Sequence, residues 1–239
     1  MIMFHYEKAW QDARARIDAA ANACGRAPAE LRLLAVSKTF PAAAVRALHA
    51  LGQRAFGENY VQEAIAKIDA LADLDDVEWH LIGPLQSNKT ALVAARFAWV
   101  HTVEREKIAA RLSSARPPGL PPLNVCVQVN ISGEAAKSGV APGATLALAR
   151  AVAALPRLRL RGLMGIAEAT GDVARQRAQF RVLADCAGGL RAAGLAIDTL
   201  SMGMSGDLEA AIAEGATLVR IGTAIFGARD GAGHAAGVA

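Results

Sequence analysis

The chain has 239 residues, of which 53% are hydrophobic and 20% charged, and its net charge is +4. This length suits one large domain or two small ones, and the apolar share can build a substantial core. The basic residues are scattered and have no aromatic residues among them, which argues against a nucleic-acid groove. Because no uninterrupted run of about eighteen apolar residues occurs, we expect no membrane span either.

The amino-terminal segment 1–25 predicts an amphipathic helix rather than a targeting signal. Phe4, Trp10 and Ile17 recur near helical spacing among charged residues, without the apolar core and cleavage site of a signal peptide. The three cysteines of the chain are widely spaced and form no CxxC pair, which indicates neither a zinc site nor a disulfide framework. We therefore expect a soluble, reduced, cytoplasmic protein without a bound metal.

Eight short apolar segments predict strands, and a helical pattern follows almost every one of them. The predicted strands span 31–38, 54–59, 77–83, 98–103, 123–130, 158–166, 196–203 and 217–222. The helical patterns between them span 41–52, 60–74, 87–97, 104–115, 142–156, 172–194 and 207–215. Strands that alternate with helices imply βαβ units and a parallel sheet.

Eight such units fit a compact (β/α)8 barrel of the TIM type. The alternative is an open doubly wound sheet, but no GxGxxG motif follows the first predicted strand. Since no linker or shift in composition divides the chain, we expect residues 1–239 to form a single α/β barrel domain with an extra amino-terminal helix.

Lys38 stands where the first predicted strand ends, in the stretch VSKTF. A lysine there can be purely structural, with its stem along apolar surface and its ammonium group in water. In such barrels, however, active sites lie at the carboxyl ends of the strands. Partial desolvation in a barrel mouth favours the neutral amine, which can attack a carbonyl and form an imine. The other strand ends carry Asn59, His80, His101, Asn130, Met164, Ser201 and Thr223. We therefore expect Lys38 to be functional, and His80 and His101 to be candidates at the rim.

The loops after the last two predicted strands favour a phosphate site. In LVRIGTAIFG, Gly222 lets the backbone approach an anion and Thr223 adds a hydroxyl donor. The partner loop SMGMSGD, 201–207, contains two glycines and two serines. Either loop alone could be an ordinary turn, but on adjacent strands they favour a phosphate cup. A lysine that forms an imine opposite this cup requires a ligand with both an aldehyde and a phosphate. Pyridoxal 5′-phosphate (PLP) meets this requirement, and so do the sugar phosphates of aldolase-like barrels.

Seven stretches, in order and spacing, resemble the pyridoxal phosphate homeostasis protein family. They are LLAVSKTF, FGENYVQE, WHLIGPLQSNK, VNISGEAAKSG, LRGLMGI, LSMGMSGD and RIGTAIFG. The resemblance covers nearly the whole chain and implies the barrel domain of the alanine racemase type, without that enzyme's second domain. It also implies a protein that binds PLP and takes part in its intracellular homeostasis without catalytic turnover. A PLP-dependent amino acid racemase is the alternative, and a Schiff-base aldolase is a weaker one.

The resemblance further implies a set of site residues. Lys38 would carry the imine, Arg220 would face the pyridine nitrogen, and Ser201, Gly222 and Thr223 would hold the phosphate. The full set of cofactor-binding residues would be Lys38, Asn59, Ser201, Met202, Gly203, Arg220, Gly222 and Thr223. Lys137 would be a second lysine near the mouth. The expected partners are PLP and PLP-dependent apo-enzymes, and we expect the chain to be a monomer.

Overall fold

Eight parallel strands form a closed barrel in the order β1 to β8, in which β8 pairs with β1. The computed structural model describes residues 2–134 and 137–227. Its strands are β1 (Arg32–Val36), β2 (Ala55–Glu58), β3 (Glu78–Leu81), β4 (Trp99–Val103), β5 (Leu123–Val129), β6 (Leu158–Gly165), β7 (Thr199–Ser201) and β8 (Leu218–Ile221). The predicted strands and the (β/α)8 architecture are therefore confirmed.

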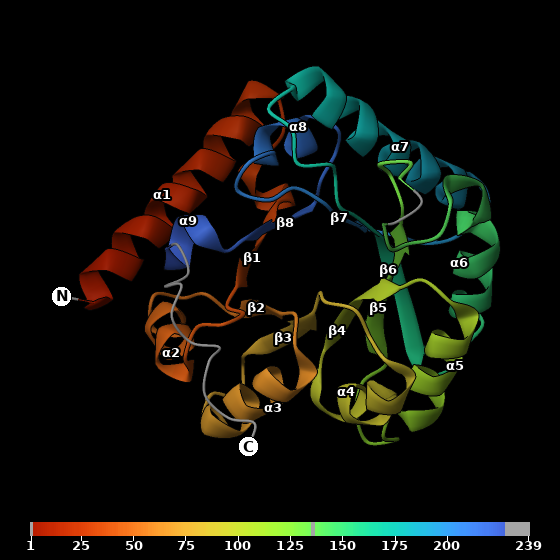
Figure 1. Cartoon of the computed structure of the whole chain (residues 1–239), viewed down its shortest axis with the longest axis horizontal. Helices are drawn as coiled ribbons and strands as arrows, with labels where there is room; N and C mark the ends of the chain where they lie inside the picture. Colours follow the sequence, from red (N-terminus) through yellow and green to blue (C-terminus); the bar gives the residue numbers. More distant parts are fainter. Residues whose placement is uncertain (1, 135–136, 228–239) are drawn as a thin grey trace, which may run out of the picture.

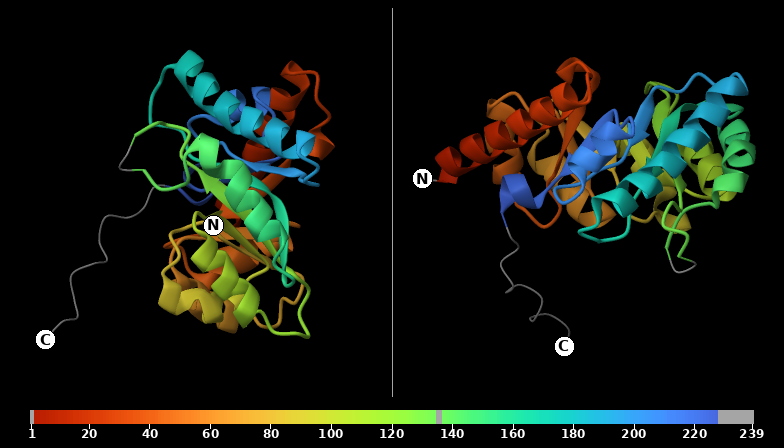
Figure 2. Two further views of the ribbon diagram at one scale, coloured as in Figure 1. Left: turned by 90° about the vertical axis from the view of Figure 1, so that its right-hand side faces the viewer. Right: turned by 90° about the horizontal axis from the view of Figure 1, so that it is seen from above.

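Helices cover the outside of the barrel (Figure 1 and Figure 2). They are α1 (Ile2–Ala23), α2 (Ala42–Ala50), α3 (Val61–Ala70), α4 (Thr90–Arg96), α5 (Glu106–Ala115), α6 (Thr145–Ala153), α7 (Val173–Ala192), α8 (Leu208–Ala213) and α9 (Thr223–Phe226). Short 3₁₀ turns are η1 (Pro28–Glu30), η2 (Ser87–Lys89) and η3 (Pro142–Ala144). The helices bury one apolar face each, as Ile108 and Leu112 do in α5. This burial holds each helix against the sheet because it removes apolar surface from water.

The extra amino-terminal helix α1 closes the side of the barrel where α8 and α9 are short. Figure 1 shows it running past α8, α9 and α2. The guanidinium of Arg16 donates to both carboxylate oxygens of Glu209 at 2.6 Å and to the backbone oxygen of Ser205 at 2.7 Å. Trp10 donates from Nε1 to Gln53 at 3.0 Å. The helix predicted over 1–25 therefore serves as an outer layer of the barrel.

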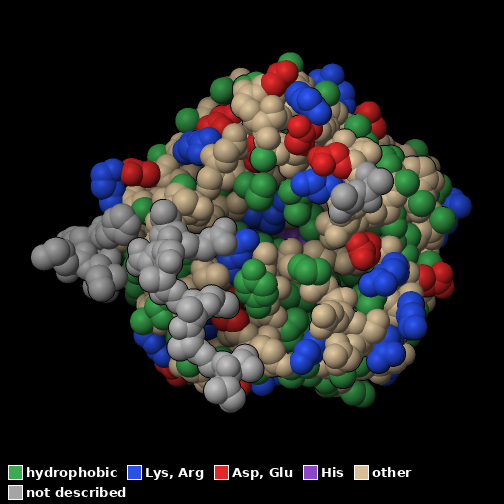
Figure 3. All heavy atoms as spheres, viewed as in Figure 1, with side chains coloured by type: hydrophobic (Ala, Val, Ile, Leu, Met, Phe, Trp, Pro, Cys, Tyr) green, Lys and Arg blue, Asp and Glu red, His purple; other side chains and the backbone are tan. Residues whose placement is uncertain are grey.

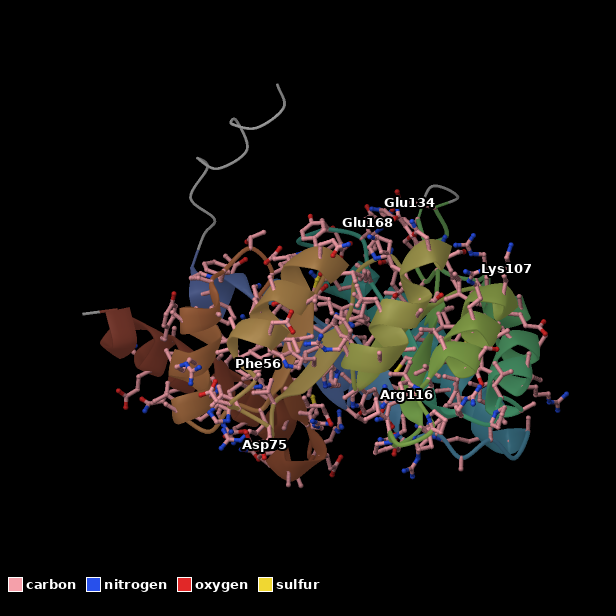
Figure 4. The ribbon with its side chains drawn as sticks, turned by 90° about the horizontal axis from the view of Figure 1, so that it is seen from below. Phe56, Asp75, Lys107, Arg116, Glu134 and Glu168 are labelled. Atoms are coloured by element: carbon pink, nitrogen blue, oxygen red, sulfur yellow. The ribbon has the colours of Figure 1, made fainter. Side chains whose placement is uncertain are left out.

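The two ends of the barrel are distinct. Figure 4 shows Glu134 and Glu168, from the loops that follow β5 and β6, on one side of the molecule. Asp75 and Arg116, from the segments that precede β3 and β5, lie toward the other side. The side that faces the viewer in Figure 1 is therefore the carboxyl end of the strands.

Candidate functional site

The carboxyl end of the barrel collects the expected site residues in loops that are far apart in sequence. Lys38 and Asn59 follow β1 and β2, and Gly203 follows β7. Gly222 lies between β8 and α9, beside the end of β1, since a Cβ atom on it would lie 3.3 Å from the backbone oxygen of Val36. In Figure 3 this face is hollowed at its centre, with Lys and Arg side chains at the edge of the hollow and histidine deep within it.

The backbone on both sides of Lys38 is held by one buried ionic cluster. Nζ of Lys67 donates to the backbone oxygen of Ser37 at 2.6 Å, to Glu58 at 2.8 Å and to Glu63 at 2.6 Å. Glu63 also accepts from the backbone N–H of Thr39 at 2.5 Å. The cluster therefore binds the backbone of Ser37, the residue before Lys38, and of Thr39, the residue after it.

The backbone conformation of Thr39 shows how strongly this cluster constrains the turn. Its φ is +68°, a left-handed conformation that a β-branched residue adopts only at a cost. The N–H bond to Glu63 and the Ser37 contact to Lys67 supply the interactions that offset this strain. Lys38 is itself half-buried. The turn that carries Lys38 is therefore held in one backbone conformation.

Glu58 is the deepest member of this cluster, because its side chain is fully buried. Its Oε1 accepts from Ser37 Oγ at 2.6 Å and from Lys67, whereas its Oε2 has no hydrogen-bond partner. Burial raises the pKa of Glu58, and the Lys67 ammonium and the Ser37 hydroxyl oppose that rise. The stretch FGENYVQE contains both carboxylates, and Lys67 follows Glu63 by one helical turn, but the sequence analysis did not assign these residues a role.

Two glycines allow the site loops to pack closely. A Cβ atom on Gly83 would lie 2.1 Å from the backbone oxygen of Asn59, so only glycine lets the loop after β3 approach Asn59. Gly203 has φ +93°, and a Cβ atom there would lie 2.6 Å from that of Ala211. These positions set the course of the chain beside Asn59 and Met202.

Arg220 points from β8 into the barrel and is buried, with 4% of its surface exposed. It donates to the backbone oxygen of Ser201 at 2.6 Å, to Ser201 Oγ at 2.9 Å and to the backbone oxygen of Gly165 at 3.0 Å. Burial lowers the pKa of its guanidinium to about 10. Arg220 therefore stays charged at neutral pH and is held at the ends of β6 and β7.

His80 and His101 were expected at the rim, and this placement is wrong. Both side chains are fully buried in the interior of the barrel, and Nδ1 of His80 lies 2.8 Å from Nε2 of His101. His80 also stacks on Trp99. Burial lowers the pKa of both imidazoles. The apolar segments were correctly read as strands, but the histidines lie within β3 and β4 and not beyond their ends.

Lys137 lies in the loop after β5 and is exposed. Its backbone oxygen accepts from Asn130 at 3.2 Å, and its backbone N–H donates to Glu134 at 3.0 Å. Within the described ranges, no group of three His, Cys, Asp or Glu side chains could hold a metal ion. In the same ranges no helix is long and apolar enough to cross a bilayer.

Comparison with known proteins assigns the barrel to a family. The sequence matches the family model described as "Alanine racemase, N-terminal domain" over residues 11–230. The "Pyridoxal phosphate homeostasis protein" of Pseudomonas aeruginosa is 64% identical over 216 residues, which are 90% of this chain and 92% of that protein. The protein of the same name from Escherichia coli K12 is 56% identical over 219 residues, covering 91% of this chain and 94% of its own length.

A solved structure adds a ligand to this comparison. PipY of Synechococcus elongatus, determined with PLP bound, is similar with a TM-score of 0.81 and 37% identity, covering 93% of this chain and 100% of that one. Fold and site together therefore define a barrel of the alanine racemase amino-terminal type. Within that class, the chain belongs to the pyridoxal phosphate homeostasis protein family.

Proposed function

We propose that this protein binds PLP at the carboxyl end of its barrel, with Lys38 as the residue that forms an imine with the PLP aldehyde. The observation that carries the proposal is the buried cluster that fixes the backbone on both sides of Lys38. A lysine whose backbone is held in this way at a barrel mouth extends its side chain from one defined point, which favours a specific covalent contact. The PLP-bound relative supports the choice of ligand.

The remaining donors fit the other parts of PLP. The Gly222–Thr223 turn and the glycine-containing loop from Gly203 to Ser205 follow the neighbouring strands β8 and β7 and suit a phosphate, which prefers backbone N–H and hydroxyl donors. Asn59 and Met202 are assigned to the ring pocket. Arg220 is assigned to the pyridine nitrogen.

Arg220 argues against PLP reactions that need a strong electron sink, although racemases tolerate a weak one. PLP enzymes that stabilise carbanions pair the pyridine nitrogen with a group that keeps it protonated. A guanidinium that is already charged cannot accept that proton. When bound, PLP supplies an electron sink, and Arg220 would keep this sink weak. We therefore propose a carrier that takes part in PLP homeostasis, without catalytic turnover.

The setting of this carrier is also a proposal. We infer a cytoplasmic monomer that passes PLP to PLP-dependent apo-enzymes, since a reversible imine can hold a reactive aldehyde and release it again. Lys137, which is exposed in the loop after β5, has no role in the proposed covalent contact.

Borohydride trapping tests the proposal directly. The purified protein with PLP should absorb in the visible range, and reduction should fix the mass of the ligand onto Lys38, as read by peptide mass spectrometry. Lys137→Ala is the matched control and should retain the label. A label on Lys137 alone, or an unchanged spectrum in Lys38→Ala, would contradict the assignment.

A further inference from the structure

A chain of hydrogen bonds runs through the interior of the barrel from one end toward the other. At the amino end, Glu78 Oε1 is 2.7 Å from His80 Nε2. His80 Nδ1 is 2.8 Å from His101 Nε2, and His101 Nδ1 is 2.8 Å from Ser201 Oγ. Ser201 Oγ in turn accepts from Arg220 at 2.9 Å. Five side chains from four strands, β3, β4, β7 and β8, therefore form one continuous path.

The ionised carboxylate at one end sets the direction of this path. Burial alone would raise the pKa of Glu78, but the bond from His80 and the charge of Arg32, which is 2.7 Å away, lower it to about 2. Glu78 can then only accept, so His80 must carry its proton on Nε2. The two imidazoles are neutral, because burial lowers the pKa of each.

The remaining protons follow from one proton per neutral imidazole. With Nε2 of His80 protonated, its Nδ1 is an acceptor, and His101 must donate from Nε2. Nδ1 of His101 is then also an acceptor, so the Ser201 hydroxyl donates a hydrogen bond to it. Because Arg220 can only donate, it occupies a lone pair of the Ser201 oxygen. Every donor in the chain therefore points toward Glu78.

The strand register places Ser201 deeper in the barrel than the Gly222–Thr223 turn. Ser201 pairs with Leu218, four residues before Gly222. At a rise of about 3.3 Å per residue, Gly222 lies about 13 Å further along the strand direction. Ser201 is also fully buried. The Ser201 hydroxyl therefore donates to His101, and the Ser201 side chain lies beside the guanidinium of Arg220.

We propose that Glu78, through His80 and His101, is a positioning residue that fixes the Ser201 hydroxyl so that its oxygen holds Arg220 in place for the ring of the bound ligand. This inference rests on the proposed PLP function for its effect on binding, but the hydrogen-bond direction exists without ligand. It assigns Ser201 to the ring end of the site, through Arg220, and leaves the phosphate to the loops at the mouth.

Nitrogen-15 NMR of the histidine rings, recorded on the protein without PLP, tests the direction. In the wild type both His80 and His101 should be protonated on Nε2 and bare on Nδ1. Glu78→Leu removes the acceptor and should mix or reverse these tautomers, whereas Glu78→Gln keeps an acceptor oxygen and should restore them. Asp198→Leu is the matched control, because Asp198 pairs with Arg161 at 2.7 Å, outside the chain. Protonation of either ring on Nδ1 in the wild type would overturn the assignment, and this measurement needs no variant to fold.

Binding of PLP and of pyridoxal, which lacks the phosphate, tests the consequence. Ser201→Ala should weaken both ligands by the same factor, roughly three- to tenfold, because it loosens Arg220 at the ring. Thr223→Ala should weaken PLP selectively. A loss for PLP alone in Ser201→Ala would show that Ser201 binds the phosphate and would sink the proposal. Failure of the wild type to bind PLP would instead refute the proposed function, while the NMR result would still decide the direction of the chain.

Discussion

We expect Lys67→Met to destabilise the protein far more than the loss of an ordinary surface lysine. Lys67 is 6% exposed and joins Ser37, Glu58 and Glu63 through its ammonium group. Methionine preserves most of the packing of the stem, but leaves the fully buried Glu58 with only the Ser37 hydroxyl as a partner. Removing one partner of a buried ion pair costs about 3–5 kcal/mol. That is a large part of the roughly 5–15 kcal/mol that stabilises a typical domain.

This loss should depend on pH, with a sign that follows from Glu58. Burial raises the pKa of Glu58 in the folded protein, and removal of Lys67 should raise it further. A carboxyl with a raised folded-state pKa stabilises the fold below its unfolded pKa, and this contribution is lost as the pH rises through the folded pKa. The variant should therefore lie closer to the wild type at about pH 5 than at about pH 8.

Urea unfolding followed by tryptophan fluorescence at both pH values measures the effect. Lys8→Met is the matched control, because Lys8 also pairs with a carboxylate four residues away at 2.6 Å, but with both side chains largely exposed. Its loss should change the free energy of unfolding little. The double variant Glu58→Gln/Lys67→Met removes the buried charge and should recover much of the loss. Equal destabilisation by Lys67→Met and Lys8→Met, independent of pH, would refute the reasoning.

Other outcomes concern ligand binding, turnover and thiol reactivity. Thr223→Ala should weaken PLP binding by about one to two orders of magnitude, since a hydrogen bond to a charged group contributes roughly 1.5–3 kcal/mol; unchanged affinity would place the phosphate elsewhere. The PLP-loaded protein should racemise single enantiomers of alanine at best slowly on chiral chromatography, because His80 and His101 are buried, neutral and bound to each other; turnover at ordinary enzyme rates would favour a racemase. Iodoacetamide should modify the exposed Cys24 in the folded protein and spare Cys126, because burial raises the pKa of the Cys126 thiol to about 12; early labelling of Cys126 on peptide mass spectrometry would contradict its burial.

The sequence by itself determined the architecture and the end of the barrel where the site should lie. Alternation of apolar strand segments with helical patterns is a local signal, and eight repeats of it have few solutions other than a barrel. Parallel strands bring their carboxyl ends to one face, so Lys38, Asn59 and Gly222 could be placed together without coordinates. The amino-terminal helix followed from periodicity in the same way.

Only the tertiary structure showed which interactions hold these residues in place. The Lys67 cluster joins the turn after β1 to β2 and α3, and the path from Glu78 to Arg220 joins four strands, so neither has a signature within one segment. His80 and His101 lie inside even the predicted strands 77–83 and 98–103, so treating them as strand ends was the error. That their side chains are buried in the barrel interior is decided by closure of the sheet. Ser201 depended on the register between β7 and β8, which is set by packing of the closed sheet and cannot be read from either strand alone.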